Sequence, residues 1–301
     1  MVEPRRGVIA PQPRRPERPR PPRAVVMRRR LVALGILLAA LIGLGFAVAG
    51  VRDRGHKQPK PVAAPKPFRI VFPEGFTRLQ MADRVKSVAE IAAHERGRTP
   101  RLSERGYRAA TAGRRLVPGF GRHPLEGFLF PATYQFTART TSAQLVRAQL
   151  KAFRRSWARI DLAYARSKNL TRYDVLTIAS MVEKEAVAPE ERPKIARVIY
   201  NRLHHRMPLQ IDATTRYGFH VPGTKSLLQS QLNSDNPYNT RKRPGLPPTP
   251  IANPGLASIQ AAAHPIDGDW LYFVRKPDKV HHFFTASEQA FNEYKNAHGF
   301  K

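Results

Sequence analysis

The sequence predicts an α+β protein held at a membrane by one helix, with a small strand–helix module and a larger α+β domain after the anchor. Three features support this prediction: an uncharged apolar run at residues 31–51, a Pro-rich segment after it, and strand and helix patterns from residue 68 onward. Hydrophobic residues make up 42% of the 301 residues, which excludes a wholly disordered chain. Cys is absent, which excludes disulfide scaffolds, thiolate zinc sites and cysteine nucleophiles.

The chain is strongly basic. Lys and Arg total 52 against 22 Asp and Glu, a formal net charge of +30. Such a balance favours a polyanionic partner, which is nucleic acid, anionic lipid or an acidic cell-wall polymer. Nucleic acid is the weakest of the three, because the charge is spread along a chain predicted to be exported and no recognition motif is present. We therefore expect no nucleic-acid partner.

The N-terminal segment predicts the location of the protein. Residues 1–30 hold ten Arg and two Glu among seven Pro, a net charge of +8, and are expected to be a disordered cytoplasmic tail. Residues 31–51 are long enough for a transmembrane helix, which needs about 20 residues. Residues 51–67 carry only +4, so the charge bias places the N-terminus in the cytoplasm and the bulk of the chain outside. The sequence thus predicts a single-pass protein of the cell (inner) membrane.

A cleaved signal peptide is the alternative to an anchor. Ala47-Val48-Ala49 resembles a small-residue cleavage site, but the apolar run is longer than the roughly 7–15 residues of a signal core. Both interpretations export residues 52–301. Residues 52–67 alternate Pro with Lys and Ala, which predicts an extended linker.

Residues 68–118 are predicted to form the small module. A strand pattern over residues 68–72 and a helix from Arg78, capped by Thr77, are separated by a Pro-Glu-Gly turn. This unit is too small to be a domain alone. Residues 97–124, rich in Gly, Arg and Pro, are expected to be loops.

Residues 119–301 are predicted to form the larger α+β domain. Thr171 and Asp174 have the spacing of a capping box, and Pro189 suits the first turn of the next helix. The predicted elements, in chain order, are a helix over 141–159, a helix from 171, a helix from 189, a mostly irregular segment over 208–255, a helix over 256–263, strands over 270–274 and 281–285, and a helix over 287–297.

Glu183 is the candidate catalytic residue. Helical spacing places it on the same apolar arc as Ala179 and Val182, whereas Lys184 points the opposite way and Glu185 lies at the edge of the arc. A carboxylate on an apolar face must be paired, protonated or facing a cleft. Burial would raise its pKa, as a general acid at neutral pH requires. On helix geometry alone, a structural Glu paired with one of the many Arg stays an open alternative.

Polar residues after this helix are candidate contacts for a ligand rich in hydroxyl and amide groups, such as a sugar. They are Asn201, Arg202, Gln210, Asp212, Tyr238, Asn239 and Thr240. The alternative is that they stabilise turns, which contain the same residue types. No metal is expected, because the neighbours in the pairs His204–His205 and His281–His282 point in different directions on a helix or strand.

The segment from Ile178 to Glu185 resembles the catalytic segment of the YceG/MltG-like endolytic peptidoglycan transglycosylases. The residues from Leu125 to Tyr134 are similar to the segment that joins the two domains of that family. The resemblance covers roughly residues 68–298, and several motifs in the right order make it specific. The further matching segments are 198–203, 209–212, 217–218, 238–240, 245–248, 251–255, 261–265 and 271–274, with His282 and Phe284.

The resemblance implies an inner-membrane lyase with a LysM-like module before its catalytic domain. Such an enzyme cleaves the MurNAc–GlcNAc bond within nascent peptidoglycan strands, leaves 1,6-anhydro-MurNAc ends and so terminates elongation. The resemblance implies that Glu183 protonates the glycosidic oxygen and then removes the proton of the muramic C6 hydroxyl, with neither water nor a cofactor. Glu185, His264 and His282 join the polar residues above as candidate substrate contacts, and peptidoglycan synthases are the expected protein partners.

The chain departs from the family pattern in its module. Residues 68–110 resemble only the latter part of the LysM-like region, and Ala132 stands where many members carry Asp. Two other functions are considered. One is a muramidase-type hydrolase in which Asp212 or Glu185 activates water, and the other is a non-catalytic anchored scaffold that holds anionic polymers through its charge.

Overall fold

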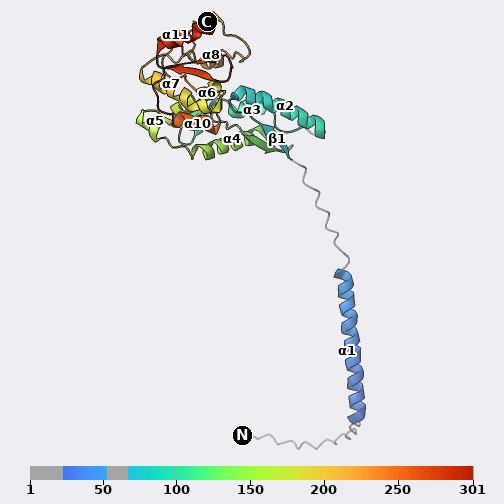
Figure 1. Ribbon diagram of the computed structural model, residues 1–301. Coiled ribbons are helices and arrows are strands. Elements are labelled where there is room, and N and C mark those ends of the chain that lie inside the picture. Colours follow the sequence, from blue (N-terminus) through green and yellow to red (C-terminus); the bar gives the residue numbers. More distant parts are fainter. Residues whose placement is uncertain (1–22, 53–66, 98, 301) are drawn as a thin grey trace, which may run out of the picture. The chain divides into compact units, whose positions relative to one another are not determined.

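The computed structural model describes residues 23–52, 67–97 and 99–300 and divides the chain into two compact units, Met1–Pro65 and Lys66–Lys301. In the first unit, α1 (Arg23–Arg52) contains the apolar run (Figure 1). None of the helices in the described residues has the length and apolar character needed to span a bilayer. The prediction of a disordered tail over residues 1–30 is wrong for residues 23–30, which belong to α1. The rest of that tail, and residues 53–66 of the predicted linker, lie outside the described residues.

The second unit is α+β, as predicted. Three antiparallel strand pairs are present in its described part: β1 (Phe68–Val71) with β4 (Thr133–Phe136), β2 (Arg114–Val117) with β3 (Gly121–Pro124), and β5 (Tyr272–Arg275) with β6 (His282–Thr285). The helices are α2 (Arg78–Arg96), α3 (Glu104–Thr111), α4 (Ser142–Trp157), α5 (Ala163–Ser167), α6 (Arg172–Glu185), the 3-10 turn η1 (Pro189–Glu191), α7 (Arg192–His204), α8 (Asp212–Gly218), α9 (Gln229–Leu232), α10 (Leu256–Ala263) and α11 (Glu288–Ala297).

Side-chain caps fix where the long helices begin. Thr77, Thr141 and Thr171 each accept a hydrogen bond from the backbone N–H three residues later, and the residue at that position bonds back to the cap in each case. These reciprocal bonds satisfy two donors that the first helical turn leaves open. The helix starts predicted from Thr77 and Thr171 are therefore confirmed.

The expectation of loops over residues 97–124 is wrong. Ser103 caps α3, which buries only Tyr107 and Thr111 and otherwise consists of charged residues, Ala and Gly, so it has no long apolar stripe to reveal it. The Gly residues of this segment mark the hairpin between β2 and β3, where Gly119 has φ of +82°. The long segment after residue 208 likewise contains the short helices α8 and α9.

The predicted small module shares a sheet with residues beyond its predicted end. Strand β1 pairs with β4, with Phe68 opposite Phe136 and Ile70 opposite Tyr134. Helix α3 also packs against α4. Residues 66–301 accordingly form one compact unit, and the functional boundary between residues 118 and 119 stays a prediction.

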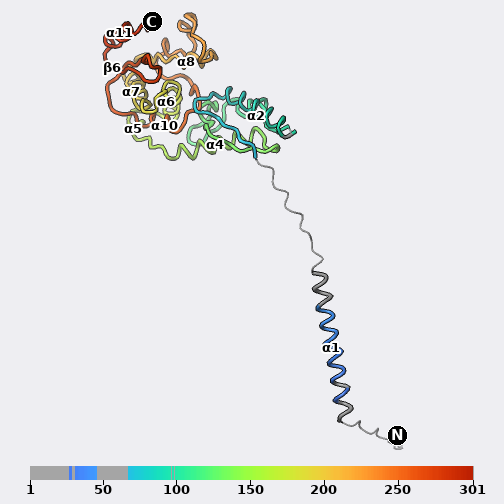
Figure 2. Tube along the Cα trace, turned by 45° about the vertical axis from the view of Figure 1, so that its right-hand side comes forward, coloured from blue at the N-terminus to red at the C-terminus, as the bar shows by residue number. Residues whose placement is uncertain are grey.

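Helix α6 lies at the centre of this unit. It packs against α10 and α7, and both views show these three helices together, between α2 and α11 (Figures 1 and 2). Its residues from Val175 to Val182 are all buried, and Ser180 Oγ accepts a hydrogen bond from Ile251 N at 3.0 Å. Because the helix leaves the core only at its last turn, its C-terminal carboxylates are placed at the surface by a rigid support.

Candidate active site

Glu183 lies on the last turn of α6, where the helix reaches the surface. Ala179 and Val182 are fully buried and Lys184 is exposed, as the helical spacing predicts, whereas Glu183 itself is partly exposed. One carboxylate oxygen, Oε2, accepts a hydrogen bond from Gly255 N at 3.0 Å. Gly255 is the N-terminal cap residue of α10, so a backbone donor at the start of one core helix orients the carboxylate at the end of another.

The turn after β1 packs directly against Glu183. Gly75 is buried with φ of +74°, a left-handed conformation that favours glycine, and a Cβ at this position would lie 3.5 Å from Glu183 Cγ. Gly75 N donates to Asn253 O at 3.0 Å, and Lys184 Nζ donates to Gly75 O at 3.4 Å. A residue from the turn after the first strand of the unit thus lies beside the candidate acid.

Glu74 brings a second carboxyl group to the same place. Its side chain is exposed and lies against Gly255, where a Cβ on residue 255 would overlap the Glu74 carboxylate. Partial burial, and then the charge of Glu183, raise the pKa of Glu74, while the charge of Arg192 lowers it. Two carboxyl groups that are 109 residues apart in sequence therefore meet at Gly255.

Two buried polar residues, Asn253 and Glu126, hold this turn in place through hydrogen bonds. Asn253 is fully buried, and its side-chain amide donates to Phe76 O at 2.9 Å and to Glu126 Oε1 at 2.8 Å. Glu126 is 3% exposed and also accepts from Arg78 N at 2.9 and 3.1 Å and from Tyr217 Oη at 3.0 Å. Burial raises the pKa of Glu126 to about 7, although these hydrogen bonds and the Arg78 charge oppose the rise.

Glu185 faces a different set of charges. Burial raises its pKa to about 7, opposed first by the charge of Arg275 and reinforced by that of Asp212. Asp212 is itself paired with Arg241, with Oδ1 2.7 Å from a guanidinium nitrogen. The two glutamates of α6 thus lie in separate surroundings, with Glu183 against the Gly75 turn and Glu185 toward the charges around α8.

Three of the predicted sugar contacts hold loops together in this structure. The Asn201 amide donates to the carbonyl oxygens of Gly268 and Trp270 at 3.1 and 2.9 Å. Arg202 is buried and donates to the backbone carbonyls of Pro208, Leu209 and Leu271 and to Gln210 Oε1, the last at 3.1 Å. These bonds favour the turn-stabilising alternative, and a direct substrate contact by these residues stays a prediction.

The Tyr238-Asn239-Thr240 motif is similarly engaged in the fold. Tyr238 Oη lies 2.9 Å from Thr249 Oγ1, and Asn239 donates to two backbone carbonyls of its own loop. Thr240 Oγ1 accepts from Ile211 N at 3.1 Å. Asn239 and Thr240 are buried, so this motif stabilises the loop before α8 from the side of the protein interior.

The two candidate histidines have hydrogen-bond or ion-pair partners other than Glu183. His264 is exposed, with Nε2 3.7 Å from an Asp161 oxygen. His282 is buried and forms two hydrogen bonds with Glu191, from its backbone N at 2.9 Å and through Nδ1 at 2.7 Å. Within the described residues, no hydrogen bond links either histidine to Glu183.

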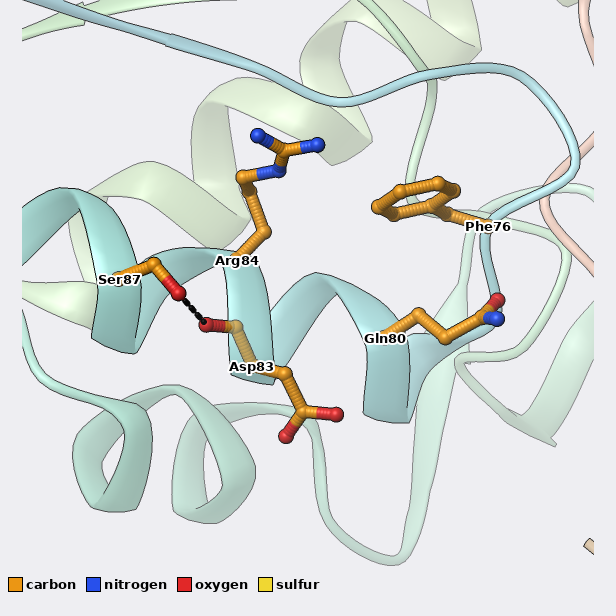
Figure 3. A pocket seen from close by; sticks show the side chains of 5 residues that line it. All are labelled: Phe76, Gln80, Asp83, Arg84 and Ser87. Atoms are coloured by element: carbon orange, nitrogen blue, oxygen red, sulfur yellow. Dashed lines mark hydrogen bonds between the residues drawn. The ribbon is translucent and has the colours of Figure 1, made fainter. Parts of the chain in front are cut away.

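A shallow pocket on α2 begins one residue after the Gly75 turn. Its lining residues are Phe76, Gln80, Asp83, Arg84 and Ser87 (Figure 3). The Arg84 guanidinium lies 5.7 Å from the centre of the partly exposed Phe76 ring. The pocket joins an aromatic face to amide and charged groups, a combination suited to a sugar.

The chain belongs to the YceG-like family, whose model matches residues 55–297. It is 43% identical over 158 residues to a protein of Bacillus subtilis (strain 168) named endolytic murein transglycosylase, covering 52% of this chain and 43% of that relative. A protein of the same name from Streptococcus pneumoniae (strain ATCC BAA-255 / R6) is 41% identical over 159 residues, covering 51% and 28% of the two chains. The chain thus spans less than half the length of these curated relatives.

The fold is also similar to a solved structure. The crystal structure of a yceG-like protein from Listeria monocytogenes superposes with a TM-score of 0.61 at 29% sequence identity, and the match covers 76% of each chain. The family assignment from the motifs around Glu183 is therefore confirmed.

Sequence patterns do not reveal the residues that surround Glu183. They predict only a turn at Glu74 and Gly75, and they indicate no role for Glu126, Asn253 or Gly255. Only the positive φ required at Gly75 had a local signal, because a Pro-Glu-Gly turn often places glycine in a left-handed conformation. The other contacts join segments distant in sequence and are set by the tertiary fold.

Proposed function

We propose that this protein is an endolytic lytic transglycosylase of peptidoglycan, with Glu183 as its catalytic acid and base. The observation that best supports this proposal is the position of Glu183. Its side chain is partly exposed at the end of a buried helix and is oriented by the backbone N–H of Gly255. The names of the bacterial relatives support the substrate and the reaction class.

In the proposed reaction Glu183 first donates one proton to the substrate and then accepts one from it. Glu183 gives its proton to the glycosidic oxygen, and the bond from that oxygen to muramic C1 breaks, which releases the GlcNAc hydroxyl. The Glu183 carboxylate then accepts the proton of the muramic C6 hydroxyl as O6 bonds to C1. The anhydro ring closes, Glu183 is protonated again and no water is consumed. A hydrolase instead usually requires a second carboxylate to act on water or on the sugar.

The hydrolase alternative receives less support from the structure. Asp212, one of its two candidate bases, forms an ion pair with Arg241, whose guanidinium donates two hydrogen bonds to Oδ1 and so engages one of the two oxygens that could accept a proton from water. Glu185 stays available as the other base. The products separate the two reactions, because a transglycosylase leaves an anhydro end and a hydrolase leaves a reducing end.

Glu183→Gln tests the proposal most directly, because Gln keeps the side-chain volume and removes both the acid and the base. One acid–base role is typically worth 10²–10⁴-fold in rate, so we expect loss of at least about 10³-fold when one residue holds two roles. Mass spectrometry of muropeptides from uncrosslinked glycan strands is the readout. Glu190→Gln is the matched control, since Glu190 is exposed and precedes α7.

Three outcomes of this experiment would contradict the proposal. If Glu183→Gln cut glycan at a near-normal rate while Glu185→Gln lost this activity, the catalytic acid would be Glu185. Reducing ends in the wild-type product would identify a hydrolase. Wild-type protein that binds glycan without cutting it would support the non-catalytic scaffold.

We also propose how the enzyme is placed in the cell, as a single-pass protein of the cell membrane with its N-terminus in the cytoplasm. The support is the uncharged run over residues 31–51 and the excess of positive charge before it. The segment 68–118 is proposed to act as a partial LysM-like module on the glycan, supported by the pocket at Phe76. Attachment to the membrane would hold the site near nascent strands and near the synthases that make them.

A further inference from the structure

Two carboxyl groups converge on one backbone amide in this structure. Gly255 N donates to Glu183 Oε2 at 3.0 Å, and the Glu74 carboxylate fills the space in front of the Gly255 Cα. A Cβ on Gly75 would lie 3.5 Å from Glu183 Cγ, so the turn that carries Glu74 runs beside the Glu183 side chain. Within the described residues no hydrogen bond holds the Glu74 carboxylate, so its position next to Glu183 is not explained by a structural bond of its own.

The positive charges around the pair are few. Arg192 lowers the pKa of Glu74, but its Nε donates to Ser258 Oγ at 3.2 Å. Lys184 Nζ donates to the Gly75 carbonyl at 3.4 Å and forms no ion pair with either carboxylate. Arg192 and Lys184 thus each donate a hydrogen bond to a neutral oxygen near the pair.

The other titratable groups nearby are acidic or are paired with one another. Glu185 lies two residues beyond Glu183 and faces Arg275 and Asp212. Glu126 is buried behind Asn253. Two neighbouring carboxyl groups with so little compensation do not ionise independently. The pair loses its first proton readily, but it retains the second proton to higher pH than a lone carboxyl group would.

We propose that Glu74 is a positioning residue that shares one proton with Glu183, so that Glu183 holds this proton when the glycan arrives. The inference rests on the proposed function, because it assigns Glu183 as the acid. In turnover Glu183 gives its proton to the glycosidic oxygen and regains one from the C6 hydroxyl, so the pair ends with the proton count with which it began. Glu74 acts between turnovers: while the shared proton is on Glu183, the negative charge of Glu74 opposes the loss of that proton.

The test compares pH profiles of anhydro-product formation for the full-length wild type, Glu74→Gln, Glu74→Asp and Glu90→Gln. Glu74→Gln removes the like charge next to Glu183, so Glu183 should lose its proton at lower pH. We expect the alkaline limb of the rate profile to move to lower pH by about one unit. Glu74→Asp keeps the charge, so its alkaline limb should lie close to that of the wild type. Glu90→Gln, an exposed charge change on α2, should leave the profile unchanged.

The outcomes separate this inference from the proposed function. If Glu183→Gln keeps forming anhydro product, the proposed function fails. If Glu183→Gln is inactive but Glu74→Gln has the wild-type profile, only the role of Glu74 is overturned. A rate that falls equally at every pH in Glu74→Gln would also overturn it, since that result indicates a lost glycan contact. Equal thermal unfolding of the variants excludes a change of fold as the cause.

Discussion

Replacing Glu126 by Gln should change how the stability of the protein depends on pH. Burial raises the pKa of Glu126 in the folded protein from 4.5 to about 7. A carboxyl group whose folded pKa is raised contributes stability that is fully present below the unfolded pKa and is lost as pH rises through the folded pKa. The difference between 4.5 and about 7 corresponds to about 3 kcal/mol lost by the wild type across that window. Glu126→Gln cannot titrate and should not lose this amount.

Urea unfolding of the purified full chain at several pH values measures the effect. At pH 4.5 the wild type should be the more stable of the two, because Gln makes poorer bonds than a carboxyl group to the Arg78 N–H, Asn253 and Tyr217 donors. Between pH 4.5 and 7 the difference in unfolding free energy should move by about 3 kcal/mol in favour of the variant. The raised pKa of Glu185 should also make the folded protein lose stability as pH rises, so Glu185→Gln provides a comparison at a second site. A difference that stays constant from pH 4.5 to 8 would refute the reasoning.

Two further predictions concern the way the site is assembled. Gly255→Ala should reproduce the acid shift of the Glu74→Gln rate profile with little change in unfolding, because the new Cβ displaces the flexible Glu74 carboxylate while the backbone of residue 255 has φ of −74°, which Ala adopts freely. An unshifted profile would contradict this. A fragment starting at Pro67 should fold and cut glycan in solution without the proposed anchor, whereas a fragment starting at residue 119 should be inactive and less stable. Comparable cutting by both fragments would show that the Gly75 turn is dispensable.

Local patterns predicted the elements that depend on local bonds. The Thr77 and Thr171 caps and the α10 helix follow from residues within one turn of each other, and the hairpin of β5 and β6 follows from two neighbouring strand patterns. The segment from residue 97 to residue 124 was mispredicted because α3 is only eight residues long and buries two of them. Arg and Gly in β2 and β3 gave no alternating apolar pattern, since these strands are largely exposed.

The candidate site was predicted only where it lies on one helix. Glu183 follows from the spacing of α6, and the family motifs reinforce it. The predicted ligands Arg202 and Asn239 have the residue types of a sugar site, but their bonds go to backbone carbonyls of the fold. Sequence alone does not show whether a polar side chain faces a ligand or a neighbouring loop. Glu74 could not be linked to Glu183 in advance, because that contact depends on the packing of β1, α6 and α10.

The hydrogen bonds that place Glu74 beside Glu183 explain why the small module cannot be treated as a separable accessory. The turn carrying Glu74 and Gly75 is held by Asn253 from the segment before α10, and Asn253 is held by Glu126 from the segment after β3. Without the turn, Asn253 would lose the Phe76 carbonyl and Glu126 would lose its two bonds from Arg78 N. A buried carboxyl group that loses hydrogen bonds costs more than the bonds themselves contribute, because its desolvation is no longer offset. The packing of the first strand and the geometry of the candidate acid are therefore parts of one connected network.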